Sequence, residues 1–272
     1  MDEQAHLLRD IHDGVLTITI NRPDQRNALT SEMRDQLTLW FQDASSDLFV
    51  RCIILTGAGD RAFCTGADLR SGAPAPARPD GAPERASGDV ARVIQEGWQR
   101  LVTSVLDCEK PVIGAINGTA AGGGMHLALA CDLVVAADTA TFIEVFIRRG
   151  IAPDAAGAWL LTRLIGIQRA KELFFLGDDV SAEQAAAMGL INRVVPALDL
   201  SETVTALATR LASGPTRALA ITKALTNRAL DVDRATSLLE EAWGQEQVTT
   251  SHDMKEGVAA FVERREPNFK GF

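Results

Sequence analysis

Residues 110–132 read KPVIGAINGTAAGGGMHLALACD, and this stretch decides the fold class. Val112–Ile116 is a short apolar run that predicts a buried strand, and Gly122–Cys131 predicts a helix. Three glycines, 122–124, stand where the helix begins. The first N–H groups of a helix have no partner within it, so they can bind an anion or a developing oxyanion. A tight turn that packs the helix closely on the strand would explain the same glycines, and both interpretations stay open here.

The chain on the N-terminal side of this stretch alternates strands and helices. Val15–Ile20 alternates apolar and polar residues, which predicts a strand. Thr30–Ser45 predicts a helix, with Thr30 or Ser31 as its cap. Cys52–Leu55 is a short, fully apolar run that predicts a second strand. Strand, helix and strand in this order predict a parallel βαβ unit and therefore an α/β protein.

The chain on the C-terminal side changes from α/β to helical. Asp89–Leu106 predicts a helix, Leu133–Ala136 a strand, and Arg193–Val195 a further short strand. We therefore predict an α/β core over residues 1–195 and a helical C-terminal region over residues 196–272. The helices expected after residue 155 are Ala156–Ile165, Gln168–Leu176, Ser181–Met188, Leu200–Leu211, Thr216–Ala229 and Asp233–Arg264.

Charge and composition exclude several classes of function. The 272 residues carry 27 Lys and Arg against 36 Asp and Glu, a net charge of -9. Nucleic-acid binding usually needs a basic surface, and membrane attachment needs a polybasic run or a long apolar helix. We therefore expect neither nucleic acid nor a membrane as a partner. The four cysteines lack zinc-site spacing, so we expect no metal and reduced thiols in the cytoplasm.

A second turn of small residues lies at Ala62–Leu69, with the sequence AFCTGADL. It can offer another backbone N–H to a ligand, although a plain loop between strand and helix would look the same. Cys64 lies in this turn, but nothing nearby in the sequence would lower the pKa of its thiol, and no catalytic signature surrounds it. We therefore do not expect Cys64 to be a nucleophile.

The two turns, in this order and spacing, resemble the crotonase superfamily of enoyl-CoA hydratases and isomerases. The resemblance rests on Gly66–Leu69 and on the glycines 122–124, and it extends over residues 10–272. Each motif is weak alone, but the combination is specific. The other matching motifs are Asn21-Arg22-Pro23, Asn27-Ala28-Leu29, Lys110 to Gly118, Cys131-Asp132-Leu133, Glu256-Gly257, Ala260-Phe261 and Glu263-Arg264-Arg265.

The resemblance implies a spiral of ββα turns followed by C-terminal helices, assembled as a homotrimer or homohexamer. It also implies an acyl-CoA thioester as substrate, with coenzyme A as part of the substrate and no separate cofactor. The backbone N–H groups of Ala67 and Gly123 would bind the thioester oxygen. The segment 71–88 holds four of the ten prolines, which predicts a long mobile loop, and it would border the acyl pocket.

Coenzyme A contacts follow from the same resemblance. Arg26 and the backbone of the second turn would hold the nucleotide, together with two residues of a neighbouring subunit. A solvated helix end is the alternative role for Arg264. The residues implied are Arg26, Cys64, Gly66, Asp68 and Leu69, with Phe261 and Arg264 from the neighbour.

The chain departs from the hydratase pattern at both of its water-activating glutamates. His126 occupies the first position and Phe146 the second, while Glu144 stands two residues too early. Asp154 instead matches a Pro-Asp pattern of some isomerase branches, including one that acts on a ring-epoxide phenylacetyl-CoA, where the aspartate is the acid/base. An alternative for Asp154 is to cap the helix that follows. His126 would orient a water, assist Asp154, shape the acyl pocket or simply pack in the core.

The environment of Asp154 would adapt it to acid/base chemistry, because apolar neighbours raise the pKa of a carboxyl group that they enclose. The expected neighbours are Phe146, Ile147, Ile151 and Trp159. The sequence thus favours double-bond isomerisation of an enoyl-CoA, with Ala67, Gly123, Asp154 and His126 in the site. Hydration assisted by His126 and a non-catalytic CoA-binding protein are the two alternatives.

Overall fold

A computed structural model describes residues 5–70, 79–83 and 88–272 of the chain. Its centre is a six-stranded sheet in the order β1-β2-β3-β5-β7-β10. Strands β1 and β2 are antiparallel, and every other neighbouring pair is parallel, which confirms the predicted α/β class. The strands are β1 (Leu7–His12), β2 (Val15–Ile20), β3 (Cys52–Gly57), β5 (Val112–Ile116), β7 (Leu133–Ala137) and β10 (Arg193–Val195).

Strand β1 is the one strand of this sheet that the apolar pattern does not predict. It lies at the sheet edge, and five of its six residues are exposed, so no apolar alternation marks it. Asp13 and Gly14 join it to β2 with φ angles of 49° and 78°. Asp-Gly between two extended segments is a hairpin signal, because both residues tolerate positive φ. The Asp-Gly turn therefore indicates strand β1, which the hydrophobic pattern does not reveal.

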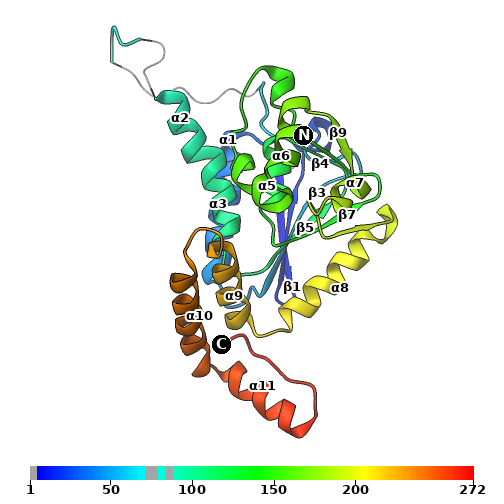
Figure 1. Ribbon diagram of the computed structural model, residues 1–272. Coiled ribbons are helices and arrows are strands. Elements are labelled where there is room, and N and C mark those ends of the chain that lie inside the picture. The colour runs from blue at the N-terminus through cyan, green and yellow to red at the C-terminus, as the bar shows by residue number, and fades with distance from the viewer. Residues whose placement is uncertain (1–4, 71–78, 84–87) are drawn as a thin grey trace.

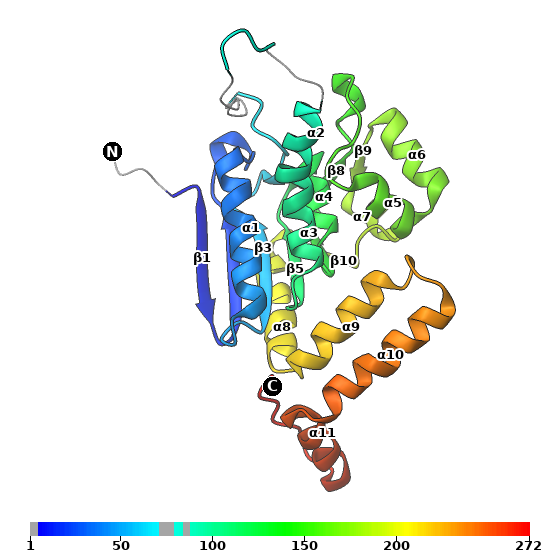
Figure 2. The same cartoon turned by 90° about the vertical axis from the view of Figure 1, so that its left-hand side faces the viewer.

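The two faces of the large sheet carry separate apolar cores, because alternate strand residues point to opposite sides. Ile53 and Leu55 of β3 face the core under α1 and α3, whereas Cys52 and Ile54 face α8. Figure 2 shows α1 and α3 side by side on one side of the sheet and α8 on the other. The helices named here are α1 (Ser31–Ser46), α3 (Arg100–Leu106) and α8 (Leu200–Ala212).

The helix predicted over 89–106 is continuous but contains a π-helical turn. It consists of α2 (Asp89–Ile94), the π turn Gln95–Gln99 and α3. Figure 1 shows it leading away from the thin grey trace that marks the segments 71–78 and 84–87. The loop predicted over 71–88 therefore lies mostly outside the described residues, with only 79–83 and Gly88 described.

A smaller four-stranded sheet, in the order β4-β6-β8-β9, carries the turns that the sequence singled out. The six-residue turn Thr65–Arg70 follows β4, and helix α4 follows β6 directly. Strands β4, β6 and β8 are parallel, so these two turns leave the sheet at the same edge. The elements are β4 (Ala62–Cys64), β6 (Thr119–Ala121), α4 (Gly123–Leu129), β8 (Thr141–Ile143) and β9 (Asp179–Ser181).

The C-terminal helices form an arm at one end of the molecule (Figure 1). The single helix expected over Asp233–Arg264 is wrong: it breaks after Thr249, and Ser251 caps a new helix by accepting a hydrogen bond from the Met254 amide at 3.1 Å. The remaining helices are α5 (Gly157–Ile165), α6 (Ile167–Leu176), α7 (Ala182–Ala187), α9 (Thr216–Arg228), α10 (Arg234–Thr249) and α11 (His252–Glu263).

Candidate active site

A cavity of about 270 Å³ brings together the second turn, the first turn of α1, the π turn and the segment before α5. Two of the sequence-predicted catalytic residues, Ala67 and Asp154, line it, and so do the predicted contacts Asp68 and Leu69. Its apolar wall comes from residues for which the sequence predicted no role in the site, although Leu29 belongs to one of the matching motifs. These are Leu29, Val93, Ile94 and Trp98.

The turn after β4 packs directly against the start of α4. A Cβ built on Gly66 would lie 3.5 Å from the backbone nitrogen of Gly123. A Cβ on Gly124 would lie only 2.1 Å from the carbonyl oxygen of Cys64. A side chain at position 124 would therefore separate the two turns. The glycine run serves close backbone approach, as the sequence pattern indicated.

Two backbone N–H groups at this junction are available to a ligand. Leu29 donates to the Gly66 carbonyl and accepts from the Asp68 amide, so the N–H of Ala67 between them points away from Leu29. Gly123 is the first residue of α4, where an N–H has no partner inside the helix. Neither N–H donates a hydrogen bond to another residue in the described ranges.

Gly123 also contacts the wall of the cavity. A Cβ built on it would lie 2.9 Å from three ring carbons of Trp98. The indole is 4% exposed and comes from the π turn. Trp98 thus covers the N-terminus of α4 and lines the same cavity as Ala67, whereas Gly123 lies behind the indole and does not itself line the cavity.

Asp154 is half-buried at this cavity and does not cap a helix. Helix α5 begins at Gly157, and its preceding residue Ala156 has a left-handed φ of 62° with no side-chain cap. Burial raises the pKa of the Asp154 carboxyl group, and the charges of His126 and Arg34 partly oppose that shift. The Asp154 carbonyl accepts a hydrogen bond from the Gln99 side chain at 3.2 Å. The capping alternative is therefore wrong.

The apolar enclosure expected around Asp154 is real but is built from other residues. Ile147 and Ile151 are half-exposed, and Trp159 lies under Arg163, whose guanidinium carbon is 4.1 Å from its ring centroid. None of them lines the cavity, whose apolar wall is formed as described above. The expectation failed because sequence neighbours of Asp154 run along the surface, while Leu29, helix α2 and the π turn supply the wall.

His126 is fully buried and bonded to a carboxylate. Its Nε2 lies 2.9 Å from Oε1 of Glu144, whose side chain is 1% exposed. Its ring stacks on Phe146 with centroids 5.2 Å apart. A Cβ built on Gly157 would lie 2.0 Å from Nε2, so the start of α5 rests on the imidazole. The pair was missed because Glu144, the residue after β8, lies 18 positions from His126, and only the fold brings the two side chains together.

The predicted coenzyme A contacts of the second turn lie close to one another, but their side chains differ in burial and in bonding partners. Cys64 is buried, which raises its thiol pKa to about 12 and rules it out as a nucleophile at neutral pH. Asp68 accepts from the Arg22 guanidinium at 3.0 Å. Leu69 is 70% exposed. Arg26 is exposed, and its carbonyl accepts a hydrogen bond from Thr65 in the same turn.

Phe261 and Arg264 lie far from this cavity within one chain. Both belong to the end of α11, in the arm opposite α2, whose residues line the cavity (Figure 1). Phe261 is 85% exposed, and Arg264 ends the helix in a left-handed conformation. One protomer therefore does not bring these two residues to the site. Their role across a subunit contact stays a prediction.

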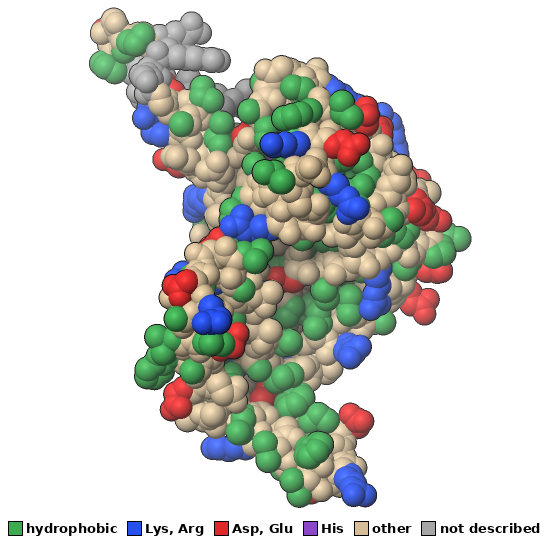
Figure 3. Space-filling model, viewed as in Figure 1, with side chains coloured by type: hydrophobic (Ala, Val, Ile, Leu, Met, Phe, Trp, Pro, Cys, Tyr) green, Lys and Arg blue, Asp and Glu red, His purple; other side chains and the backbone are tan. Residues whose placement is uncertain are grey.

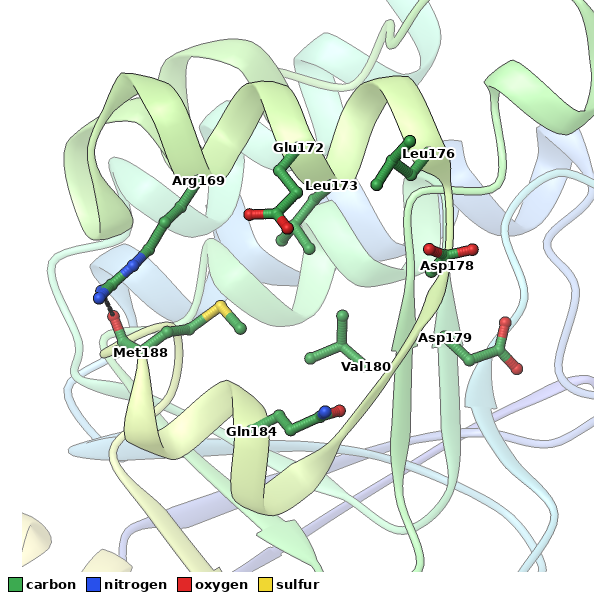
Figure 4. A pocket seen from close by; sticks show the side chains of 9 residues that line it. All are labelled: Arg169, Glu172, Leu173, Leu176, Asp178, Asp179, Val180, Gln184 and Met188. Atoms are coloured by element: carbon green, nitrogen blue, oxygen red, sulfur yellow. Dashed lines mark hydrogen bonds between the residues drawn. The ribbon is translucent and has the colours of Figure 1, made fainter.

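Four further cavities lined by described residues contain none of the predicted catalytic residues. One of about 250 Å³ lies between α6, β9 and α7, where Glu172, Asp178 and Arg169 surround a few apolar side chains (Figure 4). A larger one of about 570 Å³ lies between α5 and α9. Figure 3 shows a hollow with hydrophobic side chains between the main body and the C-terminal arm. The cavity at Asp154 is the candidate site because predicted catalytic residues line it, although it is not the largest cavity.

Metal and membrane features were also sought over residues 5–70, 79–83 and 88–272. No group of three His, Cys, Asp or Glu side chains there could hold a metal ion. No helix within these ranges combines the length and the apolar character needed to cross a bilayer.

Comparison with known proteins matches almost the whole chain. The sequence model of the family described as "Enoyl-CoA hydratase/isomerase" matches residues 10–271. A "Probable enoyl-CoA hydratase" of Rhodobacter capsulatus is 40% identical and covers 98% of both chains. The "1,2-epoxyphenylacetyl-CoA isomerase" of Escherichia coli is also 40% identical, over 97% of this chain and 98% of its own. The crystal structure of an enoyl-CoA hydratase from Bacillus anthracis superposes with a TM-score of 0.89 at 34% identity, covering 98% of this chain and 100% of that one.

Proposed function

This chain belongs to the enoyl-CoA hydratase/isomerase family, and from that premise we propose that it is an acyl-CoA isomerase in which Asp154 moves the proton. The substrate is an acyl-CoA thioester whose acyl group enters the cavity at Ala67, Trp98 and Asp154. Coenzyme A is part of this substrate, and the reaction needs no other cofactor.

The observation that carries the proposal is which of three nearby carboxylates is free to reach a substrate in the cavity. Glu144 is buried and bonded to His126, and Asp68 is bonded to Arg22. Asp154 lines the cavity, and no other side chain within the described residues forms an ion pair or hydrogen bond with its carboxylate. A base must reach the substrate to act. Asp154 meets this condition, and the other two are already engaged.

The proposed reaction needs one group that moves a proton and one site that stabilises negative charge. The Asp154 carboxylate removes a proton from the carbon next to the thioester carbonyl of a 3-enoyl-CoA. The electron pair of that C–H bond moves onto the thioester oxygen and gives a dienolate. The same carboxyl group then returns the proton to the far carbon of the former double bond. The product is a 2-enoyl-CoA, and no atom is gained or lost.

The N–H groups of Ala67 and Gly123 stabilise the enolate oxygen in this proposal. Both are backbone donors fixed by packing, so they need no reorganisation as charge develops. The α4 N-terminus adds a partial positive charge at the Gly123 side. The close approach of the Gly66 turn to the Gly123 nitrogen, which a Cβ built on Gly66 would meet at 3.5 Å, supports placing both donors on one oxygen.

Hydration is the second candidate, because several relatives carry hydratase names, including the "Short-chain-enoyl-CoA hydratase" of Clostridium acetobutylicum at 32% identity. The proposed role of His126 in it requires access to water. The imidazole is fully buried and its Nε2 is occupied by Glu144. The geometry therefore favours isomerisation, and a hydratase would have to use Asp154 alone.

Substrate conversion by the wild type and by Asp154→Asn tests the proposal. The wild type should convert 3-hexenoyl-CoA to 2-hexenoyl-CoA, followed by enone absorbance, and Asp154→Asn should lose about 10²–10⁴-fold in rate while still binding hexanoyl-CoA. Asp178→Asn, an exposed carboxylate outside the cavity, is the matched control. Loss of enone absorbance from crotonyl-CoA at higher turnover would favour hydration. Binding without conversion of any enoyl-CoA would favour a non-catalytic protein.

A further inference from the structure

Arg34 is a buried cation on the wall of the candidate site, and the proposed reaction gives it no task. It lies in the first turns of α1, is 9% exposed and lines the same cavity as Ala67 and Asp154. Within the described residues its guanidinium makes one hydrogen bond, from Nη2 to the Ser31 hydroxyl at 2.9 Å. Its Nε is buried and has no partner. A guanidinium offers five N–H donors, so most of this one is unused.

The surroundings of Arg34 hold the guanidinium in place. Its central carbon lies 5.5 Å from the Trp98 ring centroid. A Cβ built on Gly97 would lie 3.0 Å from Nη1, so the glycine in the π turn leaves room for the charged group. π-helical turns are rare and are frequent at functional sites. Both contacts come from the π turn, which also supplies Trp98 to the apolar wall of the cavity.

No carboxylate neutralises Arg34 by direct contact. The ion pairs within 4.0 Å among the described residues do not include it. Burial lowers the pKa of the guanidinium, and the charges of Asp35, Asp154 and Glu32 oppose this shift. A guanidinium stays charged in proteins. Leaving its buried Nε unsatisfied is costly, and a ligand oxygen that accepts from the guanidinium would offset that cost.

We infer that Arg34 recognises an uncharged oxygen on the acyl group, so that the enzyme acts on acyl-CoA thioesters carrying a hydroxyl, carbonyl or ether oxygen beyond the thioester. The inference rests on the proposed function, because it takes the cavity at Asp154 as the acyl pocket. Ser31 would bind the same ligand oxygen, because its hydroxyl lies beside the guanidinium and can itself donate a hydrogen bond.

An uncharged oxygen fits the site better than a carboxylate. Asp154 lines the same cavity and must be ionised to accept a proton in the proposed reaction. Its negative charge already attracts Arg34 across the cavity. A second anion placed there would repel the Asp154 carboxylate and disfavour its ionised form. A neutral acceptor uses the free N–H donors without that repulsion.

Calorimetric binding of matched, unreactive thioesters tests the inference. The set comprises hexanoyl-CoA, its monohydroxylated isomers outward from the third carbon, and adipoyl-CoA. The wild type should bind one hydroxylated isomer about tenfold more tightly than hexanoyl-CoA. Arg34→Met should remove that preference and leave the Kd for hexanoyl-CoA within about twofold, given that tenfold corresponds to about 1.4 kcal/mol. Asp35→Asn, on the exposed side of the same helix, is the control and should keep the preference.

Several outcomes would overturn the inference. These are a wild type without preference for any hydroxylated isomer, an equal loss of affinity for all thioesters in Arg34→Met, or an Arg34-dependent preference for adipoyl-CoA alone. The first measurement needs no variant, so misfolding of Arg34→Met does not block the test, and Arg34→Gln provides a second one. Failure of hexanoyl-CoA to bind at all would instead contradict the proposed function.

Discussion

His126 and Glu144 form a fully buried pair with 2.9 Å between Nε2 and Oε1, at the point where α4, β8 and the start of α5 meet. His126 stands where the hydratase pattern has a glutamate, and Glu144 stands two residues before the other one. The pair therefore places an imidazole and a carboxylate in the buried core beneath the segment that holds Asp154. Gly157 rests directly on the imidazole, three residues after Asp154. The pair consequently supports the position of the Asp154 segment.

A double-mutant cycle should show coupling between these two residues. Glu144→Leu removes the partner of a buried Nε2 and should lower the free energy of unfolding by about 1–3 kcal/mol. His126→Leu combined with Glu144→Leu should cost less than the sum of the single changes, because no polar group is then left alone. Urea unfolding measures all three variants. Additive effects would contradict the coupling, and the exposed Glu172→Leu provides the surface control.

Gly157 should tolerate no side chain. The methyl group of Gly157→Ala would overlap His126 Nε2 at 2.0 Å, in a core with no space to yield. Overpacking of this kind costs about 1–3 kcal/mol. Thermal unfolding should show the loss, whereas Ala158→Ser at the next, exposed position should change stability by less than about 0.5 kcal/mol. A Gly157→Ala variant as stable as the wild type would contradict the contact.

Asp154 should destabilise the folded protein at neutral pH. Burial raises the pKa of its carboxyl group in the folded state, so the folded state holds the proton more tightly than the unfolded state. The stability that this protonation provides is complete below the unfolded pKa of about 3.9 and is lost as pH rises through the folded pKa. Asp154→Asn should therefore have a higher Tm than the wild type at pH 7, with the difference shrinking towards pH 4. An unchanged difference across this range would contradict the burial of the charge.

The raised pKa of Asp154 should also appear in the pH dependence of kcat/KM. In the proposed reaction the ionised form of Asp154 is the base, so kcat/KM should fall as pH decreases through its raised pKa. The midpoint of this acid limb should lie above the ordinary aspartate value of about 3.9. A pH profile of kcat/KM on 3-hexenoyl-CoA measures it, and Asp178→Asn should leave the midpoint in place. A midpoint at or below the ordinary value would show that another group limits the rate.

The four cysteines should be inert in the native protein. Cys52, Cys64, Cys108 and Cys131 are all buried, and burial raises the pKa of each thiol. A thiol-reactive chromogenic disulfide should therefore label none of them at pH 8 within minutes and all four after unfolding. Rapid labelling of one thiol in the folded protein would show an opening that the structure lacks.

The sequence predicted five of the six strands of the large sheet and most of the helices, because these elements carry local signals. It predicted none of the strands of the smaller sheet, which are three residues long each. Apolar alternation marks β2, an apolar run marks β3 and β5, and Thr30 caps α1 by accepting from the Met33 amide at 3.3 Å. The break between α10 and α11 was missed, because Ser251 reads as a helix residue unless its capping bond is known. Strand β1 was missed because an exposed edge strand lacks an apolar pattern.

The sequence by itself determined the family and the glycine turns and singled out Asp154 as a candidate, since these depend on residue identity at fixed spacing. Only the tertiary structure decided what surrounds them. Arg34 and Trp98 reach Asp154 from other segments, and Glu144 reaches His126 across two elements. The physical reason is that burial and pairing of a charge depend on which segments meet in space, and packing of distant elements sets that. Composition and hydrophobic periodicity do not predict which distant segments meet.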